Sequence, residues 1–359
     1  MPDKESALFV QPGVKAIHDG MEPTKRKKFV KKKKEKQDLD ELASEVREGS
    51  RLHLAKAITL LESSNVDDKV EGQELLKKLL PYTGNSIRIG ITGVPGAGKS
   101  TFIESFGKML CSQGHKVAVL AIDPSSTVTG GSILGDKTRM EELSREKNAF
   151  IRPSPSAGTL GGVHKKTRET MLLCEAAGYD IILIETVGVG QSETIVRGMV
   201  DFFLLLVLTG AGDELQGMKK GIMELADTIL VHKADGDNIR NAKKTAAEYK
   251  QILHLLQPAT PGWTTRSMTA SSYENKGLDK VLETILEFQK QGLENGVWDS
   301  RRSQQTTDWF QSMIHDHLID SFYGNPDRKN QVQTLEQQIL NGQITVAQGV
   351  EQLFPKEAE

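Results

Sequence analysis

Several features that define other classes of protein are scarce or absent in this sequence. Only two of the 359 residues are cysteines, which excludes a disulfide framework and predicts that Cys111 and Cys174 are reduced thiols. No apolar run reaches the about 18 residues that cross a bilayer, so we expect no membrane span. A signal-type apolar region is also absent, and the acidic residues near the start are untypical of a transit peptide. These absences predict a cytoplasmic protein.

The charge of the chain is nearly balanced overall but unevenly distributed. A formal net charge of −2 gives no global field that would attract nucleic acid, so we expect no nucleic-acid partner. Nine lysines and arginines nevertheless lie between Lys25 and Lys36. Such a run is typical of a solvated, disordered tail, which we assign to residues 1–37; contact with an anionic partner is the alternative.

Residues 87–101 carry the motif around which the chain is organised. Isoleucines at positions 87, 89 and 91 predict a short buried strand, residues 101–110 predict a helix, and residues 93–100 between them fit G-x-x-x-x-G-K-[ST]. The glycines let backbone N–H groups converge on a phosphate chain, and the helix adds the positive end of its dipole. The lysine then reaches the β- and γ-phosphates, and the hydroxyl ligates Mg²⁺. The candidate nucleotide-binding residues are Gly93, Val94, Pro95, Gly96, Ala97, Gly98, Lys99, Ser100 and Thr101. A plain glycine-rich connection is the alternative.

The hydrophobic pattern around this motif predicts an α/β fold. Apolar strands are expected at 116–122, 150–152, 180–185, 202–208, 228–231 and 263–268, and helices at 136–146, 164–177, 217–226, 238–256 and 277–291. Their alternation favours a doubly wound, mostly parallel sheet with helical extensions at both ends of the chain. We divide the chain into the basic tail, an N-terminal helical segment (38–82), a P-loop core (83–292) and a C-terminal helical arm (293–359). The apolar face of the arm favours a homodimer.

A carboxylate and a glycine-rich stretch follow the strand that ends at residue 122. Asp123 lies at the carboxyl end of a parallel strand, where ligands bind, and is a candidate for holding Mg²⁺ directly or through water. Residues 130–140 have the composition of a switch segment that is ordered by the γ-phosphate and the metal, with Asp136 as a second carboxylate. Arg139 is a candidate for stabilising the charge of the transition state. A capping role for the two aspartates and a solvated Arg139 are the alternatives.

The strand at 180–185 also ends in a carboxylate. Glu185 is positioned for a second acidic role near Mg²⁺, where it would orient the attacking water, and the Gly188 amide would bond the γ-phosphate. A purely structural role for Glu185 would need a partner, because an unpaired carboxylate at the end of a buried strand is costly.

The base-recognition signal follows the strand at 228–231. Guanine-binding proteins carry Asn-Lys-x-Asp at this point, and this chain has His232, Lys233 and Asp235. Asp235 would accept the ring N–H and the exocyclic amino group of guanine, which adenine does not offer, and the Lys233 stem would pack over the base. His232 replaces an asparagine that bonds the base and braces neighbouring loops. Further along the chain, the Ser271–Ser272 pair is a weaker candidate for offering a backbone N–H to the guanine carbonyl.

Five stretches together resemble the MeaB/ArgK family of methylmalonyl-CoA mutase-associated GTPases. They are residues 93–101, 122–126, 130–140, 185–193 and 210–221, and the likeness runs from about Leu42 to Phe354. The resemblance implies a homodimeric P-loop GTPase that binds GTP and GDP with Mg²⁺. It further implies that the nucleotide state gates delivery of adenosylcobalamin to an acyl-CoA mutase and helps to eject damaged cofactor.

The same resemblance assigns roles to individual residues. Lys99, Ser100, Asp123, Asp136 and Glu185 would serve the nucleotide, Mg²⁺ and hydrolysis. Arg139 would swing toward the phosphates when the mutase is bound, and Asp213, Gln216 and Lys219 would belong to a third switch that relays the mutase contact.

Two other functions remain open at this level. A kinase of a transport system would need an acceptor pocket, which no motif marks, and a metallochaperone GTPase would be expected to carry a His- or Cys-rich tract.

Overall fold

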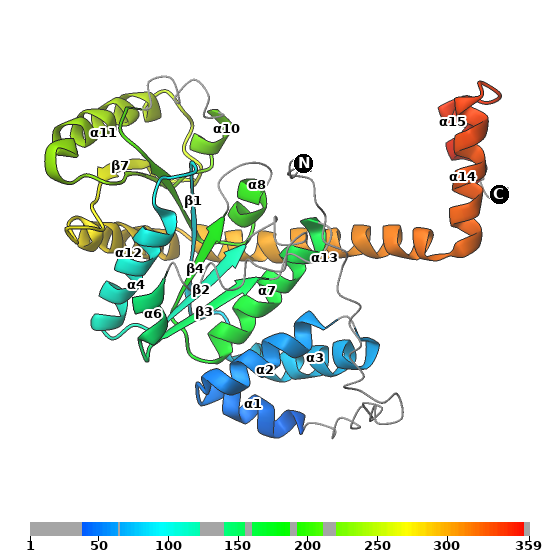
Figure 1. Ribbon diagram of the computed structural model, residues 1–359, viewed down its shortest axis with the longest axis horizontal. Helices are drawn as coiled ribbons and strands as arrows, with labels where there is room; N and C mark the ends of the chain where they lie inside the picture. Colours follow the sequence, from blue (N-terminus) through cyan, green and yellow to red (C-terminus); the bar gives the residue numbers. More distant parts are fainter. Residues whose placement is uncertain are drawn as a thin grey trace, which may run out of the picture. The chain divides into compact units, whose positions relative to one another are not determined.

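The computed structural model describes residues 38–63, 65–122, 140–154, 160–186, 192–210 and 220–354. Within these ranges, seven strands form one sheet in the order β3-β2-β4-β1-β5-β6-β7, and every neighbouring pair is parallel. The strands are β1 (Ile87–Gly93), β2 (Val117–Ile122), β3 (Ala149–Ser154), β4 (Ile181–Thr186), β5 (Phe202–Val207), β6 (Thr228–Val231) and β7 (Arg266–Thr269). The predicted doubly wound α/β sheet is confirmed, and its described strands are entirely parallel (Figure 1).

Alternate residues of the inner strands point into two separate cores, one on each face of the sheet. In β4, Ile181 and Leu183 belong to one core, whereas Ile182 and Ile184 belong to the other. This period of two is what a strand buried on both faces requires. The first core is covered by α4 (Lys99–Ser112), α6 (Glu141–Arg145) and α12 (Leu278–Glu294). The second is covered by α7 (Leu160–Ala176) and by α1 (Leu39–Arg47), α2 (Arg51–Glu62) and α3 (Val66–Leu79).

The remaining described helices lie beside the sheet or at the end of the chain. They are α8 (Ser192–Arg197), α10 (Lys220–Met223), α11 (Ile239–Leu253), α13 (Val297–Gly324), α14 (Pro326–Leu340) and α15 (Val346–Leu353), with short 3₁₀ turns at Leu80–Tyr82 and Gly236–Asn238. A third, smaller core forms where α11 packs on β5 and β6. None of the described helices is long and apolar enough to span a bilayer.

Several element boundaries differ by a few residues from the sequence prediction, and two of the differences have a clear physical reason. The strand predicted from residue 263 begins at Arg266, because residues 260–262 form a turn in which the Trp263 amide donates to the Thr260 carbonyl at 3.1 Å. The Trp263 indole is buried and donates to the Asp227 carbonyl at 2.9 Å instead of extending the sheet. Similarly, the helix predicted to reach residue 226 ends at Met223, where Leu225 and Ala226 make tighter i→i−3 bonds before β6.

Two arginines at the start of α13 bond to the segments that precede β1 and β5. The Arg302 guanidinium donates to the Asp201 carboxylate at 2.7 and 2.8 Å and to the carbonyls of Gly84 and Ser86. Arg301 donates to the Asp201 carbonyl and to Thr260.

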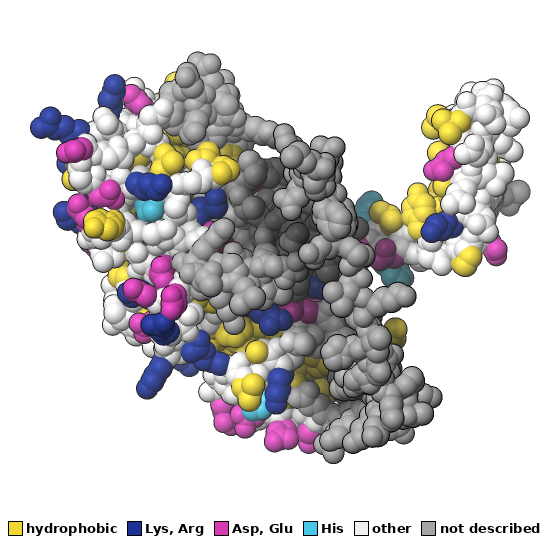
Figure 2. Space-filling view, in the orientation of Figure 1, with side chains coloured by type: hydrophobic (Ala, Val, Ile, Leu, Met, Phe, Trp, Pro, Cys, Tyr) yellow, Lys and Arg dark blue, Asp and Glu magenta, His cyan; other side chains and the backbone are white. Residues whose placement is uncertain are grey.

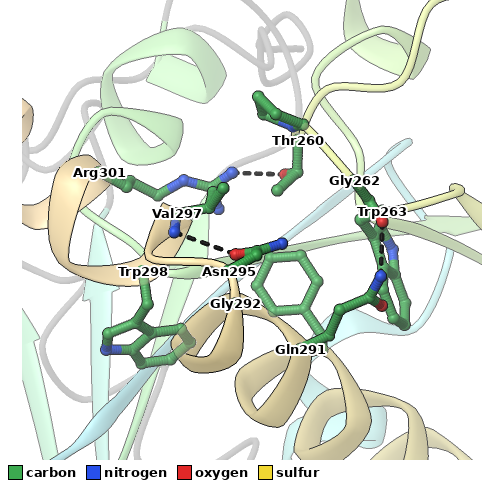
Figure 3. A pocket seen from close by; sticks show the side chains of 11 residues that line it. Thr260, Gly262, Trp263, Gln291, Gly292, Asn295, Val297, Trp298 and Arg301 are labelled. Carbon is green, nitrogen blue, oxygen red and sulfur yellow. Dashed lines mark hydrogen bonds between the residues drawn. The ribbon is translucent and has the colours of Figure 1, made fainter.

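The turn from α12 to α13 closes a small pocket beside these arginines (Figure 3). Trp263 and Trp298 line it, and Arg301 reaches Thr260 at one end. Gln291 bonds the Gly262 carbonyl and Asn295 accepts from the Val297 amide, so the turn is hydrogen-bonded on both sides. The first turn of α13 therefore belongs to the packed core.

Both cysteines are free, as the sequence predicts, and the structure shows that both are buried. Burial raises the pKa of Cys111 to about 11 and raises that of Cys174 further. Both therefore remain protonated thiols with little nucleophilic character at neutral pH.

Candidate functional site

The phosphate loop joins β1, near the middle of the sheet, to α4. Gly93 has φ +155°, and a Cβ on it would lie 2.3 Å from the Leu206 carbonyl oxygen of neighbouring β5. Gly98, the residue before α4, has φ +84°. A Cβ on Gly98 would lie only 2.9 Å from His232 Nδ1, so the absence of a side chain leaves room for the His232 ring. Both positions therefore require glycine for conformation and for space.

Lys99 and Ser100 begin α4 at the mouth of this loop. The Lys99 ammonium donates to the carbonyls of Gly93 at 2.9 Å and Val94 at 3.3 Å, so the buried lysine lies across the turn. Burial lowers the pKa of Lys99, and the negative charges of Glu185 and Glu193 oppose that shift. Two carboxylates thus lie close enough to the lysine for their charges to act on it.

The structure brings Ser100 and Glu185 together. The Ser100 hydroxyl donates to the Glu185 carboxylate at 2.9 Å, because β4 pairs with β1 in a register that sets Glu185 beside Ile91. One residue further along each strand, Thr186 donates to Thr92 at 2.8 Å, and both hydroxyls are buried. A hydroxyl and a carboxylate are hard oxygen ligands of the kind Mg²⁺ prefers, so this pair fits the predicted metal role.

The predicted base-reading residues form a second cluster beside the loop. Lys233 has φ +57°, a left-handed conformation held by a bond of 2.7 Å from Asn238 to its carbonyl, and its stem lies next to Gly98. The Asp235 carboxylate accepts from the Ser271 hydroxyl at 2.7 Å. The Ser271 amide already donates to the Lys276 carbonyl at 3.0 Å, which leaves Ser272 as the candidate of the pair for contacting a base through its amide.

His232 lies between the two clusters. The side chain is 1% exposed, Nδ1 is 2.7 Å from the Ala97 carbonyl oxygen, and Nε2 is 2.7 Å from the Ser272 hydroxyl. The ring also meets Phe102 edge-on, with centroids 5.9 Å apart. One side chain thus connects the phosphate loop with the segment that follows β7.

Several candidate residues lie outside the described residues and stay predictions. They are Asp123, Asp136, Arg139, Gly188, Asp213, Gln216 and Lys219.

The sequence predicts that Gln191, Ser192 and Glu193 belong to a switch segment after the β4 carboxylate, but it does not predict an effect of Glu193 on Lys99. In the structure Glu193 is a buried carboxylate in the first turn of α8 whose charge acts on Lys99. The available signal was its position in the helix that follows the β4 carboxylate.

Comparison with known proteins identifies the family. The model of the methylmalonyl-CoA mutase-associated GTPase MeaB matches residues 54–327. The chain is 45% identical over 315 residues to the GTPase ArgK of Escherichia coli, covering 88% of this chain and 95% of that protein. This chain belongs to the MeaB family. The MeaB-family chain is also 44% identical over 331 residues to the mitochondrial methylmalonic aciduria type A homolog of Mus musculus, covering 89% of this chain and 80% of the relative.

A solved structure supports the same assignment. The crystal structure of LAO/AO transport system kinase matches with a TM-score of 0.72 and 38% sequence identity over 88% of this chain and 96% of that chain. The MeaB-family chain is accordingly a GTP hydrolase with a P-loop α/β core.

The close approach of β1 to β5 makes the first glycine of the loop a sharp test of this geometry. We expect Gly93→Ala to lower the free energy of unfolding by about 3 kcal/mol, because the new methyl group meets the Leu206 carbonyl and the backbone is strained. Gly96→Ala is the matched control: Gly96 has φ +80° but nothing within 4 Å of an added Cβ, so only the backbone cost of about 1 kcal/mol applies. Denaturant unfolding measures both, and equal losses would contradict the assigned contact.

Proposed function

We propose that this MeaB-family GTPase is a chaperone for an adenosylcobalamin-dependent acyl-CoA mutase, with methylmalonyl-CoA mutase as the first candidate. GTP binding and hydrolysis would gate loading of the cofactor and reactivation of the mutase. The family description names association with methylmalonyl-CoA mutase, and a relative carries the name of methylmalonic aciduria type A. The single structural observation that carries the proposal is the phosphate loop with Lys99 folded over it and Ser100 bonded to Glu185.

In this proposal the residues of the loop bind and orient the nucleotide. Lys99 would exchange its two backbone carbonyls for the β- and γ-phosphate oxygens, and the amides of residues 93–101 would hold the phosphates. Ser100, Asp123, Asp136 and Glu185 would hold Mg²⁺, which neutralises developing charge on the phosphates when bound. Glu185 would also orient the attacking water, with Arg139 and the Gly188 amide contacting the γ-phosphate.

A second candidate function is phosphoryl transfer to another protein, because a matching solved structure is titled LAO/AO transport system kinase. GTP labelled at the γ-phosphate separates the two functions. Label released as inorganic phosphate supports hydrolysis, whereas label retained on a partner protein supports a kinase. A metallochaperone role has no comparable support, since the described residues contain no cluster of three or more His, Cys, Asp or Glu suited to a metal.

The coupling to a mutase is tested by turnover. We expect slow GTP hydrolysis by the isolated protein and acceleration of several-fold or more when a cobalamin-dependent mutase is added, because a partner would order the segments around the γ-phosphate. Phosphate release measures the rate, and Lys99→Ala provides the background without hydrolysis. Unchanged turnover at a saturating concentration of the cognate methylmalonyl-CoA mutase would count against the proposal.

Base selectivity is tested at Asp235. We expect Asp235→Asn to lose the preference for GTP over ATP, because an amide no longer accepts two N–H groups from guanine. The same variant should gain affinity for XTP, since xanthine presents a carbonyl where guanine presents its amino group. Calorimetry with the three nucleotides measures both effects. A variant that still selects GTP over ATP would show that Asp235 does not read the base.

We also propose that the protein is a homodimer that uses its C-terminal helices. Hydrophobic side chains lie at the surface of these helices (Figure 2). Phe310, for example, is 66% exposed. The exposed set comprises Phe310, Ile314, Leu318, Ile319, Tyr323, Leu340, Val346, Val350 and Phe354. An apolar stripe of this kind is typical of a surface that a partner covers.

We further propose the cytoplasm as the location of the protein, and its two free buried thiols are compatible with that compartment.

Light scattering tests the dimer. We expect a mass of twice 39.5 kDa for the unmodified chain. The double variant Phe310→Asp, Leu318→Asp should have the mass of one chain, because charges on the stripe would be buried without partners. Gln304→Asp on the same helix is the control and should leave the mass unchanged. A single-chain mass for the unmodified protein would contradict the proposal.

A further inference from the structure

The residue that departs from the guanine-binding signature makes two hydrogen bonds inside the protein. His232 Nδ1 lies 2.7 Å from the Ala97 carbonyl oxygen in the phosphate loop, and Nε2 lies 2.7 Å from the Ser272 hydroxyl beyond β7. Both distances are short for hydrogen bonds to a ring nitrogen. With the ring 1% exposed, both of its polar atoms have partners within the described protein.

These partners determine which nitrogen carries the proton. A carbonyl oxygen only accepts, so the bond to Ala97 requires the hydrogen on Nδ1. A neutral imidazole has one donor and one acceptor, so Nε2 must accept the hydrogen of the Ser272 hydroxyl. Burial lowers the pKa of His232, and the nearby Lys233 lowers it too, which outweighs the opposing effects of the Ala97 carbonyl and Asp235. The ring is therefore neutral at neutral pH.

A neutral ring in this arrangement has no N–H left to donate. An asparagine at the same position would carry two N–H groups, so it could bond the Ala97 carbonyl and still donate the second to an acceptor on the base. On the edge of guanine beyond its carbonyl, that acceptor is N7. The exchange of asparagine for histidine thus keeps the internal bond and removes the second donor.

We propose that His232 is a positioning residue that joins the phosphate loop to the segment at Ser272 and makes no hydrogen bond to N7 of guanine. The inference rests on the proposed guanine site. Selectivity for guanine then depends on Asp235 at the opposite edge of the base. The Ser272 carbonyl also accepts from Ser105 of α4 at 3.2 Å, so this segment is tied to the phosphate loop and to the helix behind it.

The packing around the ring explains why a histidine fits. Gly98 has no Cβ, and a methyl group there would come within 2.9 Å of Nδ1 and 3.0 Å of Cε1. Phe102 also packs edge-on against the ring, with the two centroids 5.9 Å apart. The glycine that the phosphate loop needs for its conformation therefore also provides the space for the larger ring.

The test compares the affinities of GTP and 7-deaza-GTP, in which a C–H replaces N7. We expect the unmodified protein to bind both within about twofold, since no hydrogen bond from position 232 is lost. His232→Asn should bind GTP about fivefold more tightly than 7-deaza-GTP, which corresponds to about 1 kcal/mol for the added hydrogen bond. Calorimetry in the presence of Mg²⁺ measures all four affinities.

A second variant keeps the test decisive if His232→Asn fails to fold. In Ser272→Ala, Nε2 loses its donor but remains an acceptor while Nδ1 bonds Ala97, so it still offers nothing to N7. We expect this variant to bind both nucleotides more weakly by the same factor, so that their ratio stays within about twofold.

The outcomes separate this inference from the proposed function. Discrimination against 7-deaza-GTP by the unmodified protein, or a loss confined to GTP in Ser272→Ala, would overturn the role given to His232. A folded His232→Asn protein that binds both nucleotides equally would overturn it as well. Absence of binding by either nucleotide would instead remove the guanine site itself, and with it the proposed function.

Discussion

The close approach of the end of β1 to β5 is the constraint on which the site depends. β1 pairs with β4 on one side and with β5 on the other, and it ends at Gly93, where the chain leaves the sheet and enters the phosphate loop. Because the Leu206 carbonyl fills the space that a side chain would need, the turn is set by the sheet and not by the loop alone. Lys99 then closes the turn by donating to Gly93 and Val94. The conformation of the phosphate loop is therefore fixed by its contacts with the two central strands.

At the amino-terminal ends of the central strands, buried ion pairs take the place of the loop contacts. Buried ion pairs join Arg88 to Glu175 and Arg302 to Asp201, and each carboxylate also accepts from backbone amides or hydroxyls. Burial alone would raise the pKa of Glu175, but the bonds and charge of Arg88 outweigh it and keep that pKa below its ordinary value. Such pairs are stable only when every charge is satisfied, so they fix one arrangement of the strands and α13. These ion pairs thus fix the amino-terminal ends of the strands, whereas the candidate site lies at their carboxyl-terminal ends.

The sequence predicted the parts of this molecule whose signal is local. The phosphate-loop motif and the apolar strands that alternate with helices are each visible within a few residues, and the structure confirms the α/β fold that they predict. The bond between Ser100 and Glu185 is a finding of the structure, and the metal role of the two residues stays a prediction. The strand predicted at Trp263 is wrong because an apolar side chain indicates burial without indicating direction, and the turn before this residue directs the indole to the Asp227 carbonyl. The double bonding of His232 had no local signal at all, since Ala97 and Ser272 are 135 and 40 residues away.

Long-range hydrogen bonds also join α7 and α13 to the segment that follows α8. Arg168 of α7 donates to the Gly198 carbonyl after α8 at 2.7 Å and to the Gln305 carbonyl of α13 at 3.1 Å, and Gln305 itself donates to Val200 at 2.8 Å. Burial lowers the pKa of Arg168 to about 10, so the side chain still carries its charge at neutral pH. α8 carries Glu193, whose charge acts on Lys99, in its first turn, and it ends at Arg197, one residue before Gly198. Arg168 and Gln305 therefore tie α7 and α13 to the same short segment between α8 and β5, so the start of the helical arm is fixed against the sheet by hydrogen bonds as well as by packing.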